Sequence, residues 1–215
     1  MKKLVIFDLD GTLVDTIPDI TQNVNLTLKE FGFKEREQKE ILGFVNYGAE
    51  KLLRDAIGVN ILEEDFQKAF SFYKQSYKNS TNENSLVYTG IYKLLSDLKQ
   101  LGVILCVYSN KQNDVVQNIV NSKFNGIFDC ATGQREGVKT KPDPAYILSL
   151  LDQFNVKKEN AYMIGDGDTD IKVSVNAEIH SIGVSWGYRK PEILTGLGAE
   201  FIADTTDQIL EYIKG

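Results

Sequence analysis

Short apolar runs alternate with longer helical patterns along most of the 215-residue chain. Six runs are four to six residues long and are bounded by turn residues, which is typical of buried strands. Between the later runs, apolar residues recur at the spacing of helices that pack on a sheet. This alternation predicts an α/β fold with a doubly wound parallel sheet and helices on both faces. The predicted strands are Leu4–Phe7, Val103–Tyr108, Ile127–Ala131, Ala161–Ile164, His180–Val184 and Glu200–Ala203.

The stretch from residue 16 to 84 differs, because its apolar positions follow only the helical period. It predicts helices at Ile17–Phe31, Gly48–Ile57 and Glu63–Lys78, followed by a polar, turn-rich linker over residues 79–85. We therefore expect two units. Residues 1–15 and 85–215 form an α/β core, and residues 16–84 form an inserted helical domain.

Composition and charge argue against several classes of function. The formal net charge is -6 and no basic stripe is visible, which argues against a nucleic-acid partner. The apolar run before Asp8 has only four residues, Leu4 to Phe7, too few for a signal peptide, and no stretch approaches the ~20 apolar residues of a membrane span. We expect a cytoplasmic protein without membrane contact, in which Cys106 and Cys130 are buried free thiols. The sequence is compatible with a monomer or a homodimer.

Charged and polar residues gather where the predicted strands end. The first strand ends in Asp8 and Asp10, two carboxylates whose mutual repulsion a divalent cation would remove. In open α/β sheets, ligands bind beyond the carboxyl ends of the strands. The other residues expected at this edge are Ser109, Asn110, Lys141, Asp166 and Asp170.

These residue types suit phosphate chemistry. Asp8 can attack phosphorus, and Asp8 and Asp166 are hard oxygen ligands that suit Mg²⁺. Lys141 can neutralise charge in the transition state, and Asp10 can protonate the leaving oxygen and later activate water. The single histidine, His180, lies in a strand-like run and is interpreted as a core or edge residue. Phosphoryl oxygens are expected to meet Ser109, Asn110, Thr12 and the main chain near Gly11.

Four segments, in order and spacing, resemble the motif signature of the haloacid dehalogenase-like phosphohydrolases. They are residues 7–13, Ser109-Asn110, Lys141-Pro142 and Gly165-Asp166 with Asp170. The resemblance spans the whole chain and implies a Rossmann-like core with a helical cap, corresponding to the inserted domain.

The resemblance also implies a role for each acidic residue. Asp8 would become phosphorylated, and Asp10 would be the acid/base and would offer its backbone carbonyl to Mg²⁺. Asp166 would be the third protein ligand to the metal, and Asp170 would support the site.

Finer features resemble the phosphoglycolate phosphatase branch, namely residues 44–53 and the segment Ser185–Arg189. The chain departs from the family pattern at Gly167, where Ser or Thr is usual, and at Glu178 and Asn46, where glycine is common. These departures weaken the substrate assignment but remove no catalytic group. The expected partner is a small phosphorylated metabolite, with 2-phosphoglycolate as the first choice.

Several alternatives remain open. A sugar phosphomutase of the β-phosphoglucomutase type, a pyrophosphatase or another sugar-phosphate phosphatase would carry the same motifs. A phospho-receiver switch also uses an acidic pocket with a Ser or Thr and a Lys, but receivers lack a helical block after the first strand. Lys139 competes with Lys141 for the role in the site, although Lys141 fits the motif better. Asp168 is interpreted as a solvated loop residue, and Trp186 and Tyr188 as either packing or functional aromatics.

Overall fold

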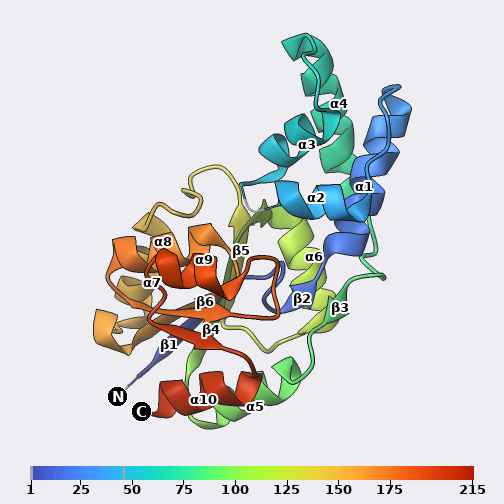
Figure 1. The fold of residues 1–215 in the computed structure, drawn as a ribbon. Coiled ribbons are helices and arrows are strands. Elements are labelled where there is room, and N and C mark those ends of the chain that lie inside the picture. The colour runs from blue at the N-terminus through green and yellow to red at the C-terminus, as the bar shows by residue number, and fades with distance from the viewer. Residues whose placement is uncertain (1, 46) are drawn as a thin grey trace.

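A six-stranded parallel sheet forms the centre of the core, with strand order β5-β4-β1-β6-β7-β8 (Figure 1). The computed structural model describes residues 2–45 and 47–215, so the Asn46 departure lies outside the described residues. The doubly wound α/β class predicted from the sequence is confirmed. The strands of this sheet are β1 (Leu4–Phe7), β4 (Ile104–Gln112), β5 (Cys130–Gln134), β6 (Ala161–Gly165), β7 (His180–Val184) and β8 (Phe201–Ala203).

Alternate residues of β1 point to opposite faces of the sheet, and each face has its own hydrophobic core. Val5 and Phe7 pack with α5 (Ile91–Gln100), α6 (Asn113–Lys123) and α10 (Thr206–Lys214). Leu4 and Ile6 pack with α7 (Ala145–Phe154) and α8 (Asp168–Ala177). The first strand is therefore buried on both faces, and its carboxyl end reaches the middle of the functional edge. The remaining short elements of the core are η1 (Lys158–Asn160) and α9 (Pro191–Gly196).

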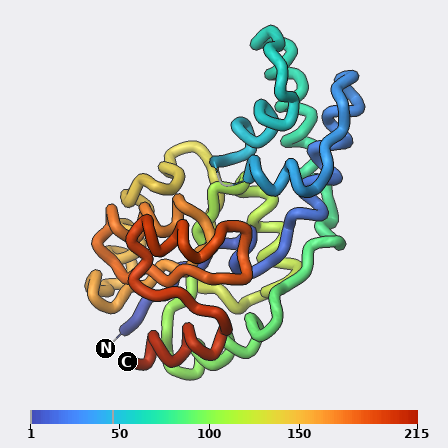
Figure 2. Tube along the Cα trace, viewed as in Figure 1, coloured from blue at the N-terminus to red at the C-terminus, as the bar shows by residue number. Residues whose placement is uncertain are grey.

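The chain leaves and re-enters the core through a two-stranded antiparallel ribbon. Its strands are β2 (Val14–Asp15) and β3 (Leu86–Val87), and Val14 pairs with Val87. Between them lie four helices that stand above the sheet edge and form the cap, as the ribbon and the tube both show (Figures 1 and 2). The cap helices are α1 (Ile17–Glu30), α2 (Gln38–Phe44), α3 (Ala49–Ile57) and α4 (Glu63–Lys78).

Two predicted strands differ from the structure. The second core strand continues through Ser109 and Asn110 to Gln112, with a register shift against β5 between Tyr108 and Gln112. The next strand begins only at Cys130, whereas the sequence predicted it from Ile127. The reason is that Ile127 donates its N–H to Phe124 in a turn, so the apolar residues before Cys130 pack into the core without joining the ladder. Cys106 and Cys130 lie opposite each other as free thiols.

Candidate active site

Asp8 and Lys141 form the centre of the site. Asp8 follows β1 directly, and its N–H still donates to Ile164 of β6, which fixes the carboxylate at the sheet edge. The Lys141 ammonium lies 2.8 Å from Asp8 Oδ1 and 2.6 Å from Asp170 Oδ1. All three side chains are buried, since those of Lys141 and Asp170 are 1% exposed and that of Asp8 is 9% exposed. Lys141 therefore bridges the candidate nucleophile and a supporting carboxylate.

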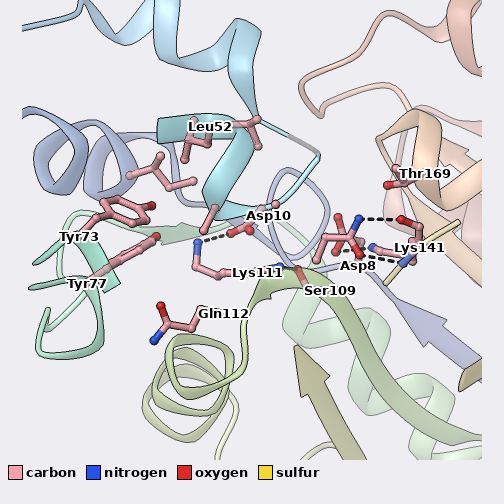
Figure 3. A pocket seen from close by; sticks show the side chains of 15 residues that line it. Asp8, Asp10, Leu52, Tyr73, Tyr77, Ser109, Lys111, Gln112, Lys141 and Thr169 are labelled. Carbon is pink, nitrogen blue, oxygen red and sulfur yellow. Dashed lines mark hydrogen bonds and ion pairs between the residues drawn. The ribbon is translucent and has the colours of Figure 1, made fainter. Parts of the chain in front are cut away.

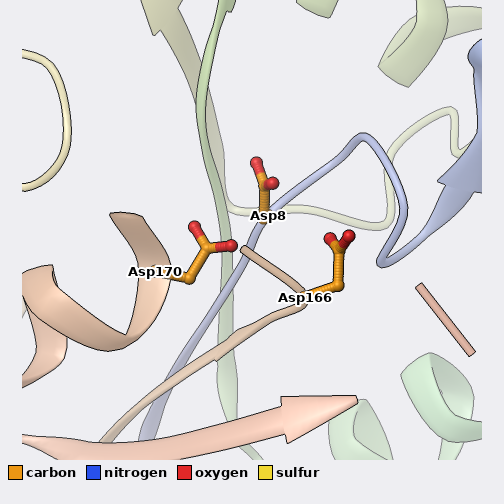
Figure 4. Close-up of side chains that lie close together, drawn as sticks. All are labelled: Asp8, Asp166 and Asp170. Carbon is orange, nitrogen blue, oxygen red and sulfur yellow. The ribbon is translucent and has the colours of Figure 1, made fainter. Parts of the chain in front are cut away.

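Asp8, Asp166 and Asp170 offer carboxylate oxygens that lie within 4.8 Å of one another (Figure 4). The oxygens of Asp166 are fixed, because Thr12 Oγ1 donates to Oδ1 and the Tyr188 N–H donates to Oδ2, both at 2.8 Å. With Asp10 included, the described site holds four carboxylates and two ammonium groups, those of Lys141 and Lys111. When all six groups are ionised, two negative charges remain uncompensated. The donor set fits a divalent cation that prefers oxygen ligands.

Burial and crowding change the acidity of these groups. Burial raises the pKa of Asp8 to about 7, and the charges of Asp170 and Asp10 add to this effect against the opposing ammonium of Lys141. Burial, together with Asp8 and Asp170, also holds the pKa of Asp166 well above its usual value. Burial opposes the charge on Lys141, but Asp170 and Asp8 outweigh it and raise the pKa of the ammonium. A cluster with these shifts is typical of a site that binds a cation or transfers protons.

Asp10 lies on the cap side of Asp8 and has its own partners. Its Oδ1 accepts hydrogen bonds from Thr16 Oγ1 at 2.5 Å and from Lys111 Nζ at 2.8 Å. The Lys111 ammonium also lies 4.6 Å from the centre of the Tyr77 ring, which belongs to cap helix α4. The candidate acid/base is therefore held from both the core and the cap linker.

The segment after β4 positions Lys141 as well as lining the pocket. The Asn110 side chain donates to the Lys141 carbonyl at 3.0 Å, and its oxygen accepts the Lys141 N–H at 2.9 Å. Ser109 is buried beside it and lines the pocket. Lys139 is exposed, and only its carbonyl is held, by the Tyr108 hydroxyl. The structure therefore places Lys141 in the site and leaves Lys139 outside it, whereas contact of Ser109 and Asn110 with phosphate stays a prediction.

Three glycines make room for the acidic residues. A Cβ on Gly11 would lie 2.3 Å from Asp166 Oδ2, and Gly11 has a φ of +81°, which favours glycine. A Cβ on Gly187 would lie 2.1 Å from Asp166 Cβ, and a Cβ on Gly165 would lie 2.3 Å from Asp170 Cβ. Glycine at these positions lets the main chain approach the carboxylates closely.

A pocket opens above these groups, between core and cap (Figure 3). The core supplies its polar floor. The cap supplies a mostly apolar wall that includes Ile20, Val45, Ala49 and Leu52. Two tyrosines of α4, Tyr73 and Tyr77, complete the wall. The volume of the pocket is about 50 Å³, so the described conformation accommodates only a small molecule.

The interpretation of Asp168 as a solvated loop residue is wrong. Its side chain is 17% exposed, accepts a hydrogen bond from the Tyr47 hydroxyl at 2.6 Å, and lies 3.1 Å from Arg189 Nε. Arg189 also donates to the carbonyl of Val45. Burial opposes ionisation, but the hydrogen bonds from Tyr47 and Arg189 lower the pKa of Asp168. This cluster connects the core loops to the cap loop.

Trp186 and Tyr188, left open between packing and function, both touch the site. The Trp186 indole N–H donates to the Thr12 carbonyl at 3.2 Å, and the Tyr188 hydroxyl accepts the Thr16 N–H at 2.9 Å. The structure also shows the local geometry of two departures from the motif. Gly167 donates its N–H to Asp170 Oδ2, and Glu178 ends α8 with a φ of 56°, a left-handed conformation in which glycine is favoured.

Sequence reasoning missed Lys111, Thr16 and Tyr77. Lys111 follows Ser109-Asn110 directly, so its place beside the second motif was a usable signal. No spacing rule pointed to Tyr77, because it lies on a cap helix whose distance from Asp10 is set by tertiary packing.

Comparison with known proteins agrees with this geometry. A family model described as haloacid dehalogenase-like hydrolase matches residues 5–184. The phosphoglycolate phosphatase of Colwellia psychrerythraea is 30% identical over 99% of this chain and 97% of its own. That of Vibrio parahaemolyticus is 28% identical over 98% and 96%.

A solved structure also resembles this fold. A phosphoglycolate phosphatase candidate from Lactobacillus delbrueckii subsp. bulgaricus superposes with a TM-score of 0.89 at 29% identity, covering 98% of both chains.

None of the described helices is long and apolar enough to cross a membrane. The family match covers most of the chain and includes the strands that carry Asp8, Ser109 and Asp166. The chain belongs to the haloacid dehalogenase-like hydrolases.

Proposed function

We propose that this protein is a Mg²⁺-dependent phosphatase that hydrolyses a small phosphomonoester, best represented by 2-phosphoglycolate, through an aspartyl-phosphate on Asp8. Its family and its relatives make it a phosphoric monoester hydrolase. The observation that carries the finer proposal is the buried Asp8 carboxylate, which faces the pocket with Lys141 on one side and Asp10 on the other.

The side chains have distinct tasks in this proposal. Asp8 attacks phosphorus and displaces the alkoxide, while Lys141 offsets the negative charge that develops on the phosphoryl oxygens. Asp10 gives its proton to the leaving oxygen. A water that Asp10 then deprotonates attacks the phosphorus of the aspartyl-phosphate, which releases phosphate and restores the Asp8 carboxylate.

The carboxylates present fit a bound Mg²⁺. Asp8 and Asp166 would hold it, together with the main-chain carbonyl that the family resemblance assigns to Asp10. Support comes from the carboxylate oxygens of three residues within 4.8 Å of one another, and from burial and neighbouring carboxylates, which raise the pKa values of Asp8 and Asp166. When bound, Mg²⁺ would neutralise the carboxylates and polarise the phosphoryl oxygens.

The pocket supports a small substrate rather than a sugar phosphate. Most of the described cap residues that line it are aliphatic, and the hydroxyls of Tyr73 and Tyr77 are the polar side-chain atoms that these cap residues offer to sugar hydroxyls. The relatives named above are phosphoglycolate phosphatases, which favours 2-phosphoglycolate over the β-phosphoglucomutase and pyrophosphatase alternatives.

The test is phosphate release from a panel of small phosphomonoesters, measured with Mg²⁺ and with chelator, for the wild type and Asp8→Asn. We expect metal-dependent turnover that Asp8→Asn abolishes, while Asp204→Asn, an exposed control, keeps full activity. Acid quenching of Asp10→Asn with an aryl phosphate should trap a phosphoryl group on the peptide that contains Asp8. Undiminished turnover by a pure Asp8→Asn preparation would show that the mechanism is wrong.

A further inference from the structure

A lysine lies at each end of the pocket, and in the proposed chemistry only Lys141 acts on the phosphoryl group. Among the described residues that line it, the positively charged side chains are Lys141 and Lys111. Lys141 is committed to Asp8 and Asp170. Figure 3 shows Lys111 on the far side of Asp10 from Asp8, beside the two cap tyrosines. The role of this second end is not explained by phosphoryl transfer to Asp8.

Lys111 is buried, and its ammonium has N–H donors that its ion pair with Asp10 does not use. Its side chain is 5% exposed, and its ammonium is paired with Asp10 Oδ1 at 2.8 Å. A lysine ammonium carries three N–H donors, so this ion pair leaves room for an acceptor in the pocket. A lysine is rarely fully buried unless its ammonium is paired with an anionic group.

Tyr77 gives a second, independent sign of a missing ligand. Its side chain is 2% exposed, and its hydroxyl is a buried polar atom without a hydrogen-bond partner among the described residues. Figure 3 shows this hydroxyl pointing toward the Lys111 end of the pocket. Burial holds the pKa of Tyr77 well above its usual value, so the hydroxyl stays protonated and can donate. Buried donors without partners are rare in native structures and require an explanation.

We propose that Lys111 and the Tyr77 hydroxyl form a subsite for the distal carboxylate of the substrate, and so select carboxylated phosphomonoesters. The inference rests on the proposed function, because it assumes that the phosphoryl group occupies the Asp8 end. With the two groups at opposite ends, the ester oxygen lies between them, beside Asp10, where it must be protonated. The cap wall supplies no other cation among the described lining residues, so the carboxylate has Lys111 as its counter-ion.

The experiment compares two substrates of similar size, 2-phosphoglycolate and ethyl phosphate, which lacks the carboxylate. The readout is the ratio of their kcat/KM values in Lys111→Met and Tyr77→Phe. Lys111→Met should lower this preference by about 10- to 100-fold and Tyr77→Phe by about 3- to 10-fold. The matched controls are Lys51→Met and Tyr92→Phe, which alter exposed residues outside the pocket and should leave the ratio unchanged.

A role of Lys111 in holding Asp10 alone would lower turnover of both substrates equally. An unchanged ratio in both variants therefore overturns the subsite. If the wild type hydrolyses neither compound, the proposed function fails, and calorimetric binding of the same two compounds to Asp8→Asn with Mg²⁺ still decides the subsite. Loss of the preference for 2-phosphoglycolate on adding Lys111→Met supports it, and an unchanged preference overturns it.

Discussion

Replacing Lys141 by methionine is expected to destabilise the metal-free protein, and the loss should depend on pH. Lys141 makes ion pairs of 2.8 and 2.6 Å with Asp8 and Asp170. Removing one partner of a buried ion pair costs about 3–5 kcal/mol, because it leaves an uncompensated buried charge. Methionine keeps most of the apolar stem, so a cavity contributes little. We therefore expect the free energy of unfolding to fall by about 3–5 kcal/mol in the variant at alkaline pH.

The pH dependence follows from Asp8. Its pKa in the folded protein is raised to about 7 from 3.8, so its favourable contribution is fully present below 3.8 and is lost as the pH rises through 7. Without Lys141 the folded pKa rises further, and ionised Asp8 costs more. Below about pH 7 both proteins hold Asp8 protonated, and the remaining deficit comes from Asp170. The deficit of the variant should therefore grow by up to about 2 kcal/mol between about pH 7 and about pH 8.5.

Urea unfolding followed by far-ultraviolet circular dichroism, in the presence of a chelator, measures this difference. The control is Lys139→Met, which removes the same charge from an exposed position two residues away and should change stability by less than about 0.5 kcal/mol. A deficit of the same size at both pH values, or none at all, would refute the electrostatic reasoning.

Three further results are expected. Saturating Mg²⁺ should raise the melting temperature of the wild type in a thermal scan. A ligand that binds only the folded state stabilises it by about 2.7 kcal/mol at a hundredfold excess over Kd. Asp166→Asn should remove most of this shift. Gly11→Ala should weaken Mg²⁺ binding measured by calorimetry and lower stability by at least about 1 kcal/mol, because its Cβ would meet Asp166 at 2.3 Å and its φ is +81°; unchanged Mg²⁺ affinity would contradict the close approach. Asp168→Asn should weaken the contacts of Asp168 with Tyr47 of the cap loop and with Arg189 of the core, and so speed limited proteolysis between core and cap with little effect on the unfolding of the core. Protease resistance equal to that of the wild type would argue against this link.

Much of the candidate site was accessible from the sequence because parallel strands deliver their ends to one edge. Asp8, Ser109 and Asp166 each end or follow an apolar run, and the pairing of β1 with β4 and β6 brings those ends together. Local pattern therefore sufficed for these residues and for the doubly wound class. The prediction from local pattern failed where packing overrides it. At Ile127 the apolar residues turn into the core instead of extending the strand.

What only the tertiary structure decided are the contacts between segments far apart in the chain. Lys111 reaches Asp10 across 101 positions, and Tyr47 reaches Asp168 across 121. Neither pair has a periodic signal. The contact between Asp10 and Lys111 depends on the pairing of β1 with β4, and the contact between Tyr47 and Asp168 depends on where packing places the cap over the sheet edge. The sequence by itself determined which groups can do the chemistry. The fold determined which of them hold one another in place, and which cap residues line the pocket.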